Sequence, residues 1–276
     1  MKVRTGRAVV NGVTIAYDDA GAGEPLVLVH GHPFDRSMWA PQIAALAGPA
    51  RRVVVPDLRG YGESGVVPGT TPLGAFARDI AALLDHLGLD RAVIGGLSMG
   101  GQIVMEFYRL FPERVRGLLL ADTFAGADTA EGRRARRGQA ERLLREGMGP
   151  YAEEVLTKMI APYNVAARPE VAAHVLGMMR AAPPAGAAAA LRGRAERPCY
   201  GDLLGTVTVP TLVVVGRDDE FTPVSDAEYM RDRVPGAALV VIEGAAHLPN
   251  LERPRRFNQA LRGLLSAVED AAALAS

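Results

Sequence analysis

The sequence has a single cysteine, Cys199, among its 276 residues. One thiol cannot form a disulfide within the chain, and it cannot supply the ligands of a multi-cysteine metal site. The chain also lacks a run of about 18 consecutive apolar residues, which a membrane-spanning helix requires. No apolar segment follows the charged first residues, as it would in a signal peptide. We therefore expect no metal centre, no membrane association and a cytoplasmic location.

The chain also has no net charge, because 31 lysines and arginines balance 31 aspartates and glutamates. A chain without a net field does not attract nucleic acid or an anionic membrane over a distance. Six arginines do cluster between positions 133 and 145, but Glu131, Glu141 and Glu146 are interleaved with them and no aromatic residue is. We interpret this segment as a solvated helix face. The expected partner is a small neutral molecule, not nucleic acid.

What the chain does have is 49% apolar content and a regular alternation of strand-like and helix-like segments. Asn11-Gly12 joins the first two β-prone runs, which is a strong hairpin signal. Six later apolar runs are typical of strands buried on both faces of a parallel sheet, at 26–30, 52–56, 92–94, 115–121, 210–216 and 238–242. The pattern predicts an α/β fold with a doubly wound, mostly parallel sheet and an N-terminal antiparallel hairpin.

The alternation stops between Thr123 and Pro198. This stretch is rich in alanine and arginine, contains no convincing strand, and is interrupted by prolines at 162, 169, 183 and 184. A helical insertion in an α/β chain is typical of a lid carried on a loop of the sheet. We therefore predict a core domain formed by residues 1–122 and 199–276, and a helical cap formed by residues 123–198.

The segment Gly96-Leu97-Ser98-Met99-Gly100 lies where the strand at 92–94 gives way to a helical pattern. It matches the nucleophile elbow G-x-S-x-G, a sharp strand-to-helix turn whose glycines let the two elements approach closely. A phosphate-binding loop is the obvious alternative, but no Lys-Ser/Thr pair follows and the spacing is not G-x-G-x-x-G. The motif predicts Ser98 as a nucleophile.

A serine hydroxyl is a weak nucleophile, so it needs a base, and the base needs an acid to orient it. Of the five histidines, His247 is the best candidate for the base, because it stands in a small-residue loop directly after the strand at 238–242. Asp219 follows the strand at 210–216 and is the preferred acid. Asp218 and Asp122 also follow strands and remain alternatives.

The tetrahedral intermediate of acyl transfer needs two N–H donors for its oxyanion. One is expected from the backbone of Met99, the residue after the nucleophile. The other is expected from His32, in the loop after the strand at 26–30. Only the backbone of His32 is required, so its imidazole need not take part. This chemistry uses no cofactor and no metal ion.

Five stretches resemble, in order, the successive motifs of the α/β-hydrolase superfamily: 30–33, 57–64, 96–100, 216–223 and 244–247. The resemblance covers nearly the whole chain, and the chain order Ser, Asp, His is the order of that family. Segments 96–101 and 179–188 resemble the 3-oxoadipate enol-lactonase and cofactor-free haloperoxidase/esterase groups, whereas His30-Gly31 differs from the enol-lactonase pattern. The resemblance implies an α/β-hydrolase fold and the hydrolysis of an ester or a lactone.

We therefore expect a serine hydrolase that cleaves carboxylic esters of small molecules through an acyl-enzyme. Rival activities on this fold are lactone or enol-lactone hydrolysis, C–C bond hydrolysis and peracid formation. A slow-turnover ligand receptor is the alternative among non-enzymes. Methionine is flexible, so Met159, Met178 and Met179 of the cap are candidate pocket residues, although methionine more often fills gaps in a core.

Overall fold

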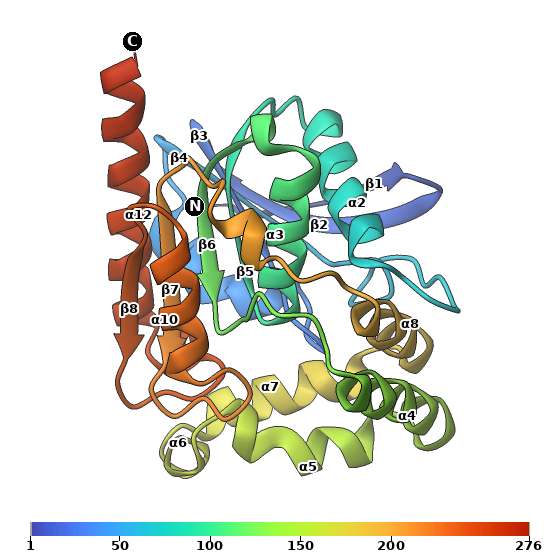
Figure 1. Ribbon diagram of the computed structural model, residues 1–276. Coiled ribbons are helices and arrows are strands. Elements are labelled where there is room, and N and C mark those ends of the chain that lie inside the picture. Colours follow the sequence, from blue (N-terminus) through green and yellow to red (C-terminus); the bar gives the residue numbers. More distant parts are fainter. Residues whose placement is uncertain (1, 276) are drawn as a thin grey trace.

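The chain begins with a β-hairpin in the computed structural model, which describes residues 2–275 (Figure 1). Strand β1 (Arg4–Val10) pairs along its whole length with residues 13–19 of β2 (Val13–Gly21). Asn11 and Gly12 form the turn with φ angles of 48° and 75°. This left-handed backbone is the one that a two-residue hairpin turn needs and that asparagine and glycine adopt most readily. The predicted hairpin is confirmed.

Six more strands extend the hairpin into one sheet with the order β1-β2-β4-β3-β5-β6-β7-β8. β2 pairs antiparallel with β1 and β4, and the other neighbours are parallel. The added strands are β3 (Glu24–Val29), β4 (Arg51–Pro56), β5 (Ala92–Leu97), β6 (Val115–Ala121), β7 (Thr211–Gly216) and β8 (Ala238–Ile242). Because parallel strands end at the same edge, the loops that follow them meet there.

Helices cover both faces of the sheet, because side chains alternate between the faces along each strand. Val27 and Val29 of β3 join an apolar cluster with α2 and α3, whereas Leu26 and Leu28 join another with α1 and α12. Figure 1 shows α12 on one side of the sheet and α2 and α3 on the other. The helices of the core are α1 (Ala40–Leu46), α2 (Leu73–His86), α3 (Met99–Leu110), α9 (Gly201–Leu204), α10 (Val224–Arg233), α11 (Pro249–Glu252) and α12 (Pro254–Ala275), with 3₁₀ turns η1 (Arg36–Trp39) and η2 (Pro112–Arg114).

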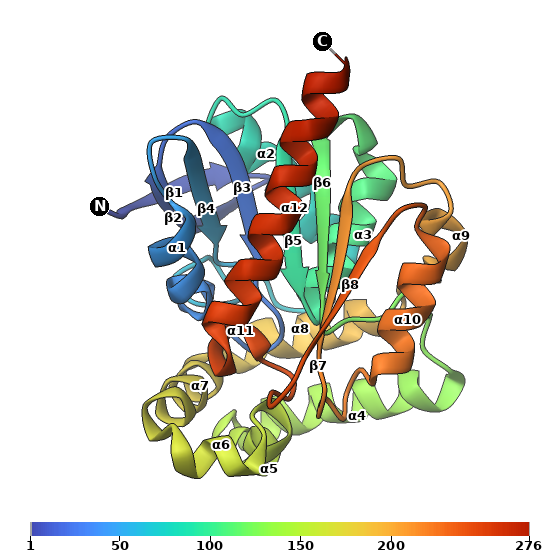
Figure 2. The ribbon, with the colours of Figure 1, turned by 90° about the vertical axis from the view of Figure 1, so that its left-hand side faces the viewer.

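Of the six helices between β6 and β7, the five that precede α9 gather at the carboxyl ends of the parallel strands (Figures 1 and 2). They are α4 (Ala130–Glu146), α5 (Gly149–Met159), α6 (Pro162–Ala167), α7 (Pro169–Ala181) and α8 (Pro184–Ala195). Prolines begin three of them, since the first helical position needs no N–H donor. The insertion is helical as predicted, and its boundaries as a separate domain, at 123 and 198, stay a prediction.

Two glycines bring α8 against loops of the core. A Cβ on Gly186 would lie 2.0 Å from the carbonyl oxygen of Gly60, and a Cβ on Gly193 would lie 1.7 Å from that of Thr71. Only glycine allows backbones to approach so closely. On its other side α8 packs along α4. Side chains of α8 and α4 are therefore held over the edge of the sheet where the strands end.

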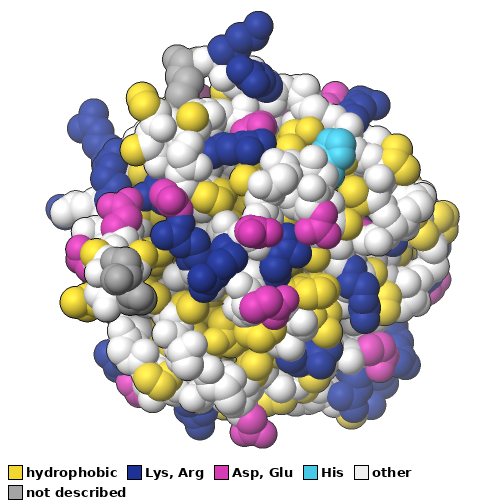
Figure 3. All heavy atoms as spheres, turned by 90° about the horizontal axis from the view of Figure 1, so that it is seen from above, with side chains coloured by type: hydrophobic (Ala, Val, Ile, Leu, Met, Phe, Trp, Pro, Cys, Tyr) yellow, Lys and Arg dark blue, Asp and Glu magenta, His cyan; other side chains and the backbone are white. Residues whose placement is uncertain are grey.

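Charged side chains of both signs are mixed on the face turned away from these helices (Figure 3). On α4, Arg137 pairs with Glu196, and Arg142 and Arg145 both pair with Glu146, as expected for a solvated helix face. Arg136 differs from its neighbours and belongs to the site described below.

Within residues 2–275, no helix combines the length and the apolar character that crossing a membrane would need.

Candidate active site

Ser98 stands between the end of β5 and the start of α3 with φ 58° and ψ −118°, a strained backbone for a residue that has a Cβ. The neighbouring glycines make so tight a turn possible. A Cβ on Gly96 would lie 2.2 Å from the carbonyl carbon of Gly100, and a Cβ on Gly100 would lie 2.2 Å from the carbonyl oxygen of Val29. The hydroxyl of Thr123 donates to the carbonyl oxygen of Ser98 at 2.7 Å. The backbone therefore has the geometry of a nucleophile elbow.

His247 and Asp219 come together from the loops after β8 and β7. Nδ1 of His247 lies 2.8 Å from Oδ2 of Asp219, and both residues are buried. Gly216 lets the two loops touch, since a Cβ there would lie 1.9 Å from the carbonyl oxygen of Ala246. Because a carboxylate can only accept hydrogen bonds, the proton is on Nδ1 and Nε2 keeps a free lone pair. His247 can therefore act as a base through Nε2.

Asp219 has the surroundings of a charged carboxylate. Its oxygens accept hydrogen bonds from the N–H groups of Phe221, at 2.8 Å, and Thr222, at 3.2 Å, and from the hydroxyl of Thr222. Burial alone would raise the pKa of Asp219, but its interaction with His247 and the hydrogen bonds from Thr222 and Phe221 hold it below its usual value. Asp219 therefore carries a negative charge at neutral pH.

The two alternative acids have different surroundings. Asp122, buried after β6, accepts one hydrogen bond, from the N–H of Gly216 at 2.8 Å. Burial and the nearby charge of Asp219 raise the pKa of Asp122 well above its usual range, which favours its neutral form. Asp218 accepts from the hydroxyl of Tyr163 on α6. Of the three aspartates, Asp219 is the one bonded to His247.

Asp122, Asp219 and His247 also offer ligand atoms within 4.8 Å of one another, the spacing of a metal site. The Nδ1 proton of His247, however, lies in its bond to Asp219, and a metal at that atom would have to displace it. We interpret the three side chains as an acid–base group.

The loop after β3 passes directly beside the elbow. A Cβ on Gly31 would lie 2.9 Å from the carbonyl oxygen of Leu97 and 3.1 Å from the Cβ of Ser98, so glycine favours this close approach. His32 follows and is joined to Pro33 by a cis peptide bond. The N–H groups of His32 and Met99 have no hydrogen-bond partner within residues 2–275. Two free N–H groups near a nucleophile are what an oxyanion hole needs.

The imidazole of His32 faces the site as well, although the sequence required only its backbone. Its Nδ1 lies 2.7 Å from the hydroxyl oxygen of Tyr61, and its buried Nε2 has no partner in the described part of the chain. Burial and the charges of Arg194 and Arg136 lower the pKa of His32 well below its usual value. The ring is therefore neutral at pH 7.

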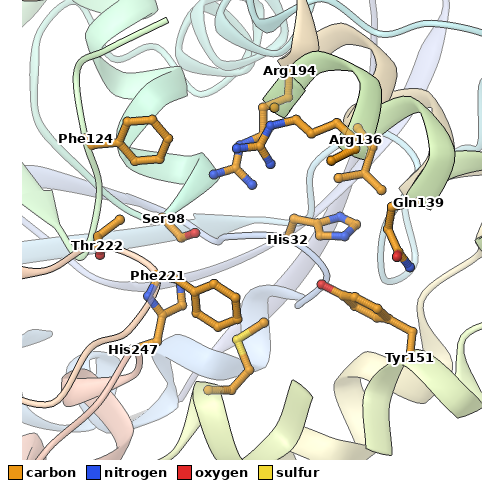
Figure 4. A pocket seen from close by; sticks show the side chains of 14 residues that line it. His32, Ser98, Phe124, Arg136, Gln139, Tyr151, Arg194, Phe221, Thr222 and His247 are labelled. Carbon is orange, nitrogen blue, oxygen red and sulfur yellow. The ribbon is translucent and has the colours of Figure 1, made fainter. Parts of the chain in front are cut away.

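A cavity of about 390 Å³ joins these groups (Figure 4). From the core it is lined by His32, Ser98, Phe221, Thr222 and His247, and from the loop between β6 and α4 by Phe124. From the inserted helices it is lined by Gly132, Ala135, Arg136, Gln139, Tyr151, Met159, Leu191 and Arg194. Ser98 and His247 thus open into one space under the helical insertion, and that space has the size of a small organic ligand.

The three candidate methionines are placed differently. Met159, at the end of α5, lines the cavity. Met178 and Met179 of α7 lie outside its lining and are 4% and 0% exposed in the apolar cluster that α7 shares with α5. They occupy the face of α7 that packs on the neighbouring helix, which is the usual place of methionine in a core.

Polar residues of the inserted helices are the part of the site that the sequence motifs did not indicate. Arg194, Arg136, Gln139 and Tyr151 all line the cavity. One signal was available on α8, where three apolar residues recur at helical spacing and place Arg194 on the same stripe: Ala187, Ala190 and Leu191. A charged residue on the apolar face of a helix is often functional, because burying it has a cost in free energy.

A sequence model of the alpha/beta hydrolase fold family matches residues 24–254, which is most of the chain. The protein therefore belongs to the α/β-hydrolase family, as the elbow and the order of the strands indicated. It is 31% identical over 232 residues to 3-oxoadipate enol-lactonase 2 of Acinetobacter baylyi, covering 83% of this chain and 84% of that one.

Solved structures agree with this assignment. A thermophilic esterase from Thermogutta terrifontis, solved with malate bound, is 43% identical, with a TM-score of 0.91 over 97% of this chain and 99% of that one. The enol-lactonase of Burkholderia xenovorans LB400 is 27% identical, with a TM-score of 0.88 over 95% and 100% of the two chains. The chain is thus a hydrolase of the ester or lactone type.

Proposed function

We propose that this protein hydrolyses carboxylic esters of small molecules through an acyl-enzyme formed on Ser98. The observation that carries the proposal is the bond between His247 Nδ1 and charged Asp219 beside an elbow serine, with Ser98 and His247 lining one cavity. This is the constellation that activates a serine hydroxyl.

In the first half of the reaction, Nε2 of His247 takes the proton of Ser98 as Oγ attacks the ester carbonyl carbon. The negative charge that develops on the carbonyl oxygen is bound by the N–H groups of Met99 and His32. Asp219 stabilises the imidazolium that forms. When the intermediate collapses, the ester C–O bond breaks and His247 gives its proton to the departing alcohol.

In the second half, a water molecule replaces the alcohol. His247 removes one of its protons, the hydroxide oxygen attacks the acyl carbon, and the bond to Ser98 breaks as His247 returns the proton to Oγ. The products are the acid and the free enzyme. The reaction as proposed uses no cofactor.

Lactones are cyclic esters and fit the same steps, with the alcohol remaining attached to the acyl group. The enol-lactonases among the similar proteins make lactones the second candidate substrates. We further propose that residues 123–198 act as a cap that selects the acyl group, because α4, α5 and α8 supply more than half of the cavity lining.

The test is a turnover screen over 4-nitrophenyl esters of increasing acyl length and over small lactones, with the wild type and Ser98→Ala. We expect Ser98→Ala to lose on the order of 10³-fold or more in kcat with an unchanged melting temperature, since the substitution removes only the nucleophilic oxygen. Mass spectrometry of the wild type after a short reaction should show one acyl group on the peptide that contains Ser98. Activity of Ser98→Ala within tenfold of the wild type would exclude the proposal. An acyl burst without further turnover would favour a receptor.

A further inference from the structure

The charged side chains that line the cavity are all positive. Two lining residues, Arg136 and Arg194, are basic, and none is an aspartate or glutamate. Arg194 is only 8% exposed, and its one side-chain hydrogen bond runs from Nε to Oε1 of Gln102 at 2.7 Å. The two terminal nitrogens of its guanidinium have no partner within residues 2–275. They can therefore bind a molecule in the cavity.

The acidic group nearby is already shared by other arginines. Asp128 binds both Arg136 and Arg197, with Nη1 of Arg197 2.9 Å from Oδ2. Two guanidinium groups, those of Arg136 and Arg197, therefore share this carboxylate, and Arg194 has no ion pair within residues 2–275. Burial and the charges of Arg136 and Arg197 lower the pKa of Arg194. A buried charge without a partner is costly, and an anion bound beside it would reduce that cost.

Two neutral polar groups face the same space. Nε2 of Gln139 and Nε2 of His32 are both buried without a hydrogen-bond partner in the described chain, and both residues line the cavity. The amide nitrogen of Gln139 is a donor, and Nε2 of His32 is a donor in the tautomer in which Nδ1 accepts from the hydroxyl of Tyr61. Unpartnered buried polar atoms are rare in native proteins, and their convergence on one cavity indicates a missing ligand. A carboxylate, which accepts up to four hydrogen bonds and pairs with a guanidinium at two atoms, matches this set of donors.

The position of Arg194 indicates which half of an ester would bear that carboxylate. His247 must protonate the departing alcohol, so the alcohol half lies toward His247 and the acyl half extends away from it. Figure 4 shows Arg194 and Arg136 on the opposite side of Ser98 from His247. The guanidinium groups therefore lie on the side that the acyl chain occupies.

We propose that Arg194, assisted by Arg136, binds a carboxylate at the far end of the acyl chain, so that the preferred substrates are monoesters of short dicarboxylic acids or lactones that carry a free carboxylate. This assignment rests on the proposed ester hydrolysis at Ser98. Arg194 and Arg136 would determine the charge of the preferred substrate, which the acid–base group does not determine.

The test compares monomethyl glutarate with its neutral isostere methyl 5-methylhexanoate, following proton release at constant pH. We expect the wild type to prefer the charged ester in kcat/KM. The substitution Arg194→Met should lower the ratio of charged to neutral kcat/KM by about 10- to 100-fold, the usual effect of one charge-assisted bidentate contact. Arg194→Lys, which keeps the charge without the planar fork, should give an intermediate ratio.

Arg192→Met is the matched control, because Arg192 lies on the same helix, pairs with Glu141 and does not line the cavity. It should leave the ratio unchanged. Binding of glutarate, measured by calorimetry, gives a readout without turnover, and Arg194→Met should weaken it at least about tenfold. Melting temperatures verify that each variant is folded.

The outcomes separate the two proposals. If the wild type cleaves the neutral ester through Ser98 without preferring the charged one, only the carboxylate site is wrong. If neither these two esters nor the 4-nitrophenyl esters and lactones are cleaved through Ser98, the proposed function is wrong, and glutarate binding still decides on the site. Equal glutarate affinity in the wild type and Arg194→Met overturns the inference in either case.

Discussion

Replacing Asp219 by asparagine tests the assignment of the acid most sharply. The amide oxygen would keep the hydrogen bonds from the N–H groups of Phe221 and Thr222. The amide nitrogen would take the place of Oδ2 and turn an N–H toward Nδ1 of His247. His247 would then accept at Nδ1 and carry its proton on Nε2, the atom that must receive the proton of Ser98.

The magnitude follows from two losses. In the active tautomer of His247, the Nδ1–H would face the N–H of the new amide. One of these two buried donors would then have no acceptor, which costs about 1–3 kcal/mol. The imidazolium that forms during attack also loses a charge-assisted hydrogen bond, worth about 1.5–3 kcal/mol. Together they raise the barrier by about 3–6 kcal/mol, which corresponds to a loss of about 10²- to 10⁴-fold in kcat/KM.

The assay is the steady-state hydrolysis of 4-nitrophenyl butyrate at pH 7.5 or a similar pH by Asp219→Asn, Asp122→Asn and Asp218→Asn. Asp122 makes no hydrogen bond to His247, so its replacement by an amide of the same shape should change kcat/KM by less than about threefold. Asp218→Asn alters a contact with Tyr163 and should have a similarly small effect. A loss below tenfold in Asp219→Asn, or an equal loss in Asp122→Asn, would refute the reasoning.

Two further predictions concern stability and specificity. Because the pKa of Asp122 is raised in the folded protein, its contribution to stability is full at low pH and is lost as the pH rises through that pKa. The melting temperature of Asp122→Asn minus that of the wild type should therefore increase as the pH rises above about 4, the usual pKa of an unfolded aspartate; a difference that does not change with pH would contradict the raised pKa. Met179→Ala should lower the free energy of unfolding by about 2–5 kcal/mol without changing acyl-chain preference, whereas Met159→Ala should mainly widen that preference. Thermal melts measure the first effect, and profiles of kcat/KM against acyl length measure the second. The reverse pattern would contradict the placement of Met159.

The parts of the site that could be predicted from the sequence are those that the backbone determines. Gly96 and Gly100 are needed because their Cβ positions coincide with neighbouring backbone atoms, so the elbow has a local signature. His247 and Asp219 could be found because parallel strands bring the loops at their carboxyl ends together. Choosing Asp219 over Asp122 on physical grounds required the structure, because the two differ in the number of hydrogen-bond donors around them.

The parts that could not be predicted depend on how helices pack. Met159, Met178 and Met179 look alike in the sequence, and only the contact of α5 with α7 decides which of them reaches the cavity. Arg136 stands in an arginine-rich segment in which Arg137 and Arg142 are paired on the surface, so the sequence did not distinguish it from them. Each of these residues is a single position in a regular helix, without a motif around it.

The expectation of a neutral partner shows why a whole-chain property does not describe a cavity. The chain has equal numbers of basic and acidic residues, but charges separated by more than about 8 Å are largely screened at physiological ionic strength. A substrate beside Ser98 therefore interacts with the groups that line its own cavity, and among these the ionised side chains are guanidinium groups. Burial strengthens their attraction for an anion, since the low local dielectric screens it less than water would. The balance of charge in the lining, and not the balance in the composition, thus favours an anionic substrate.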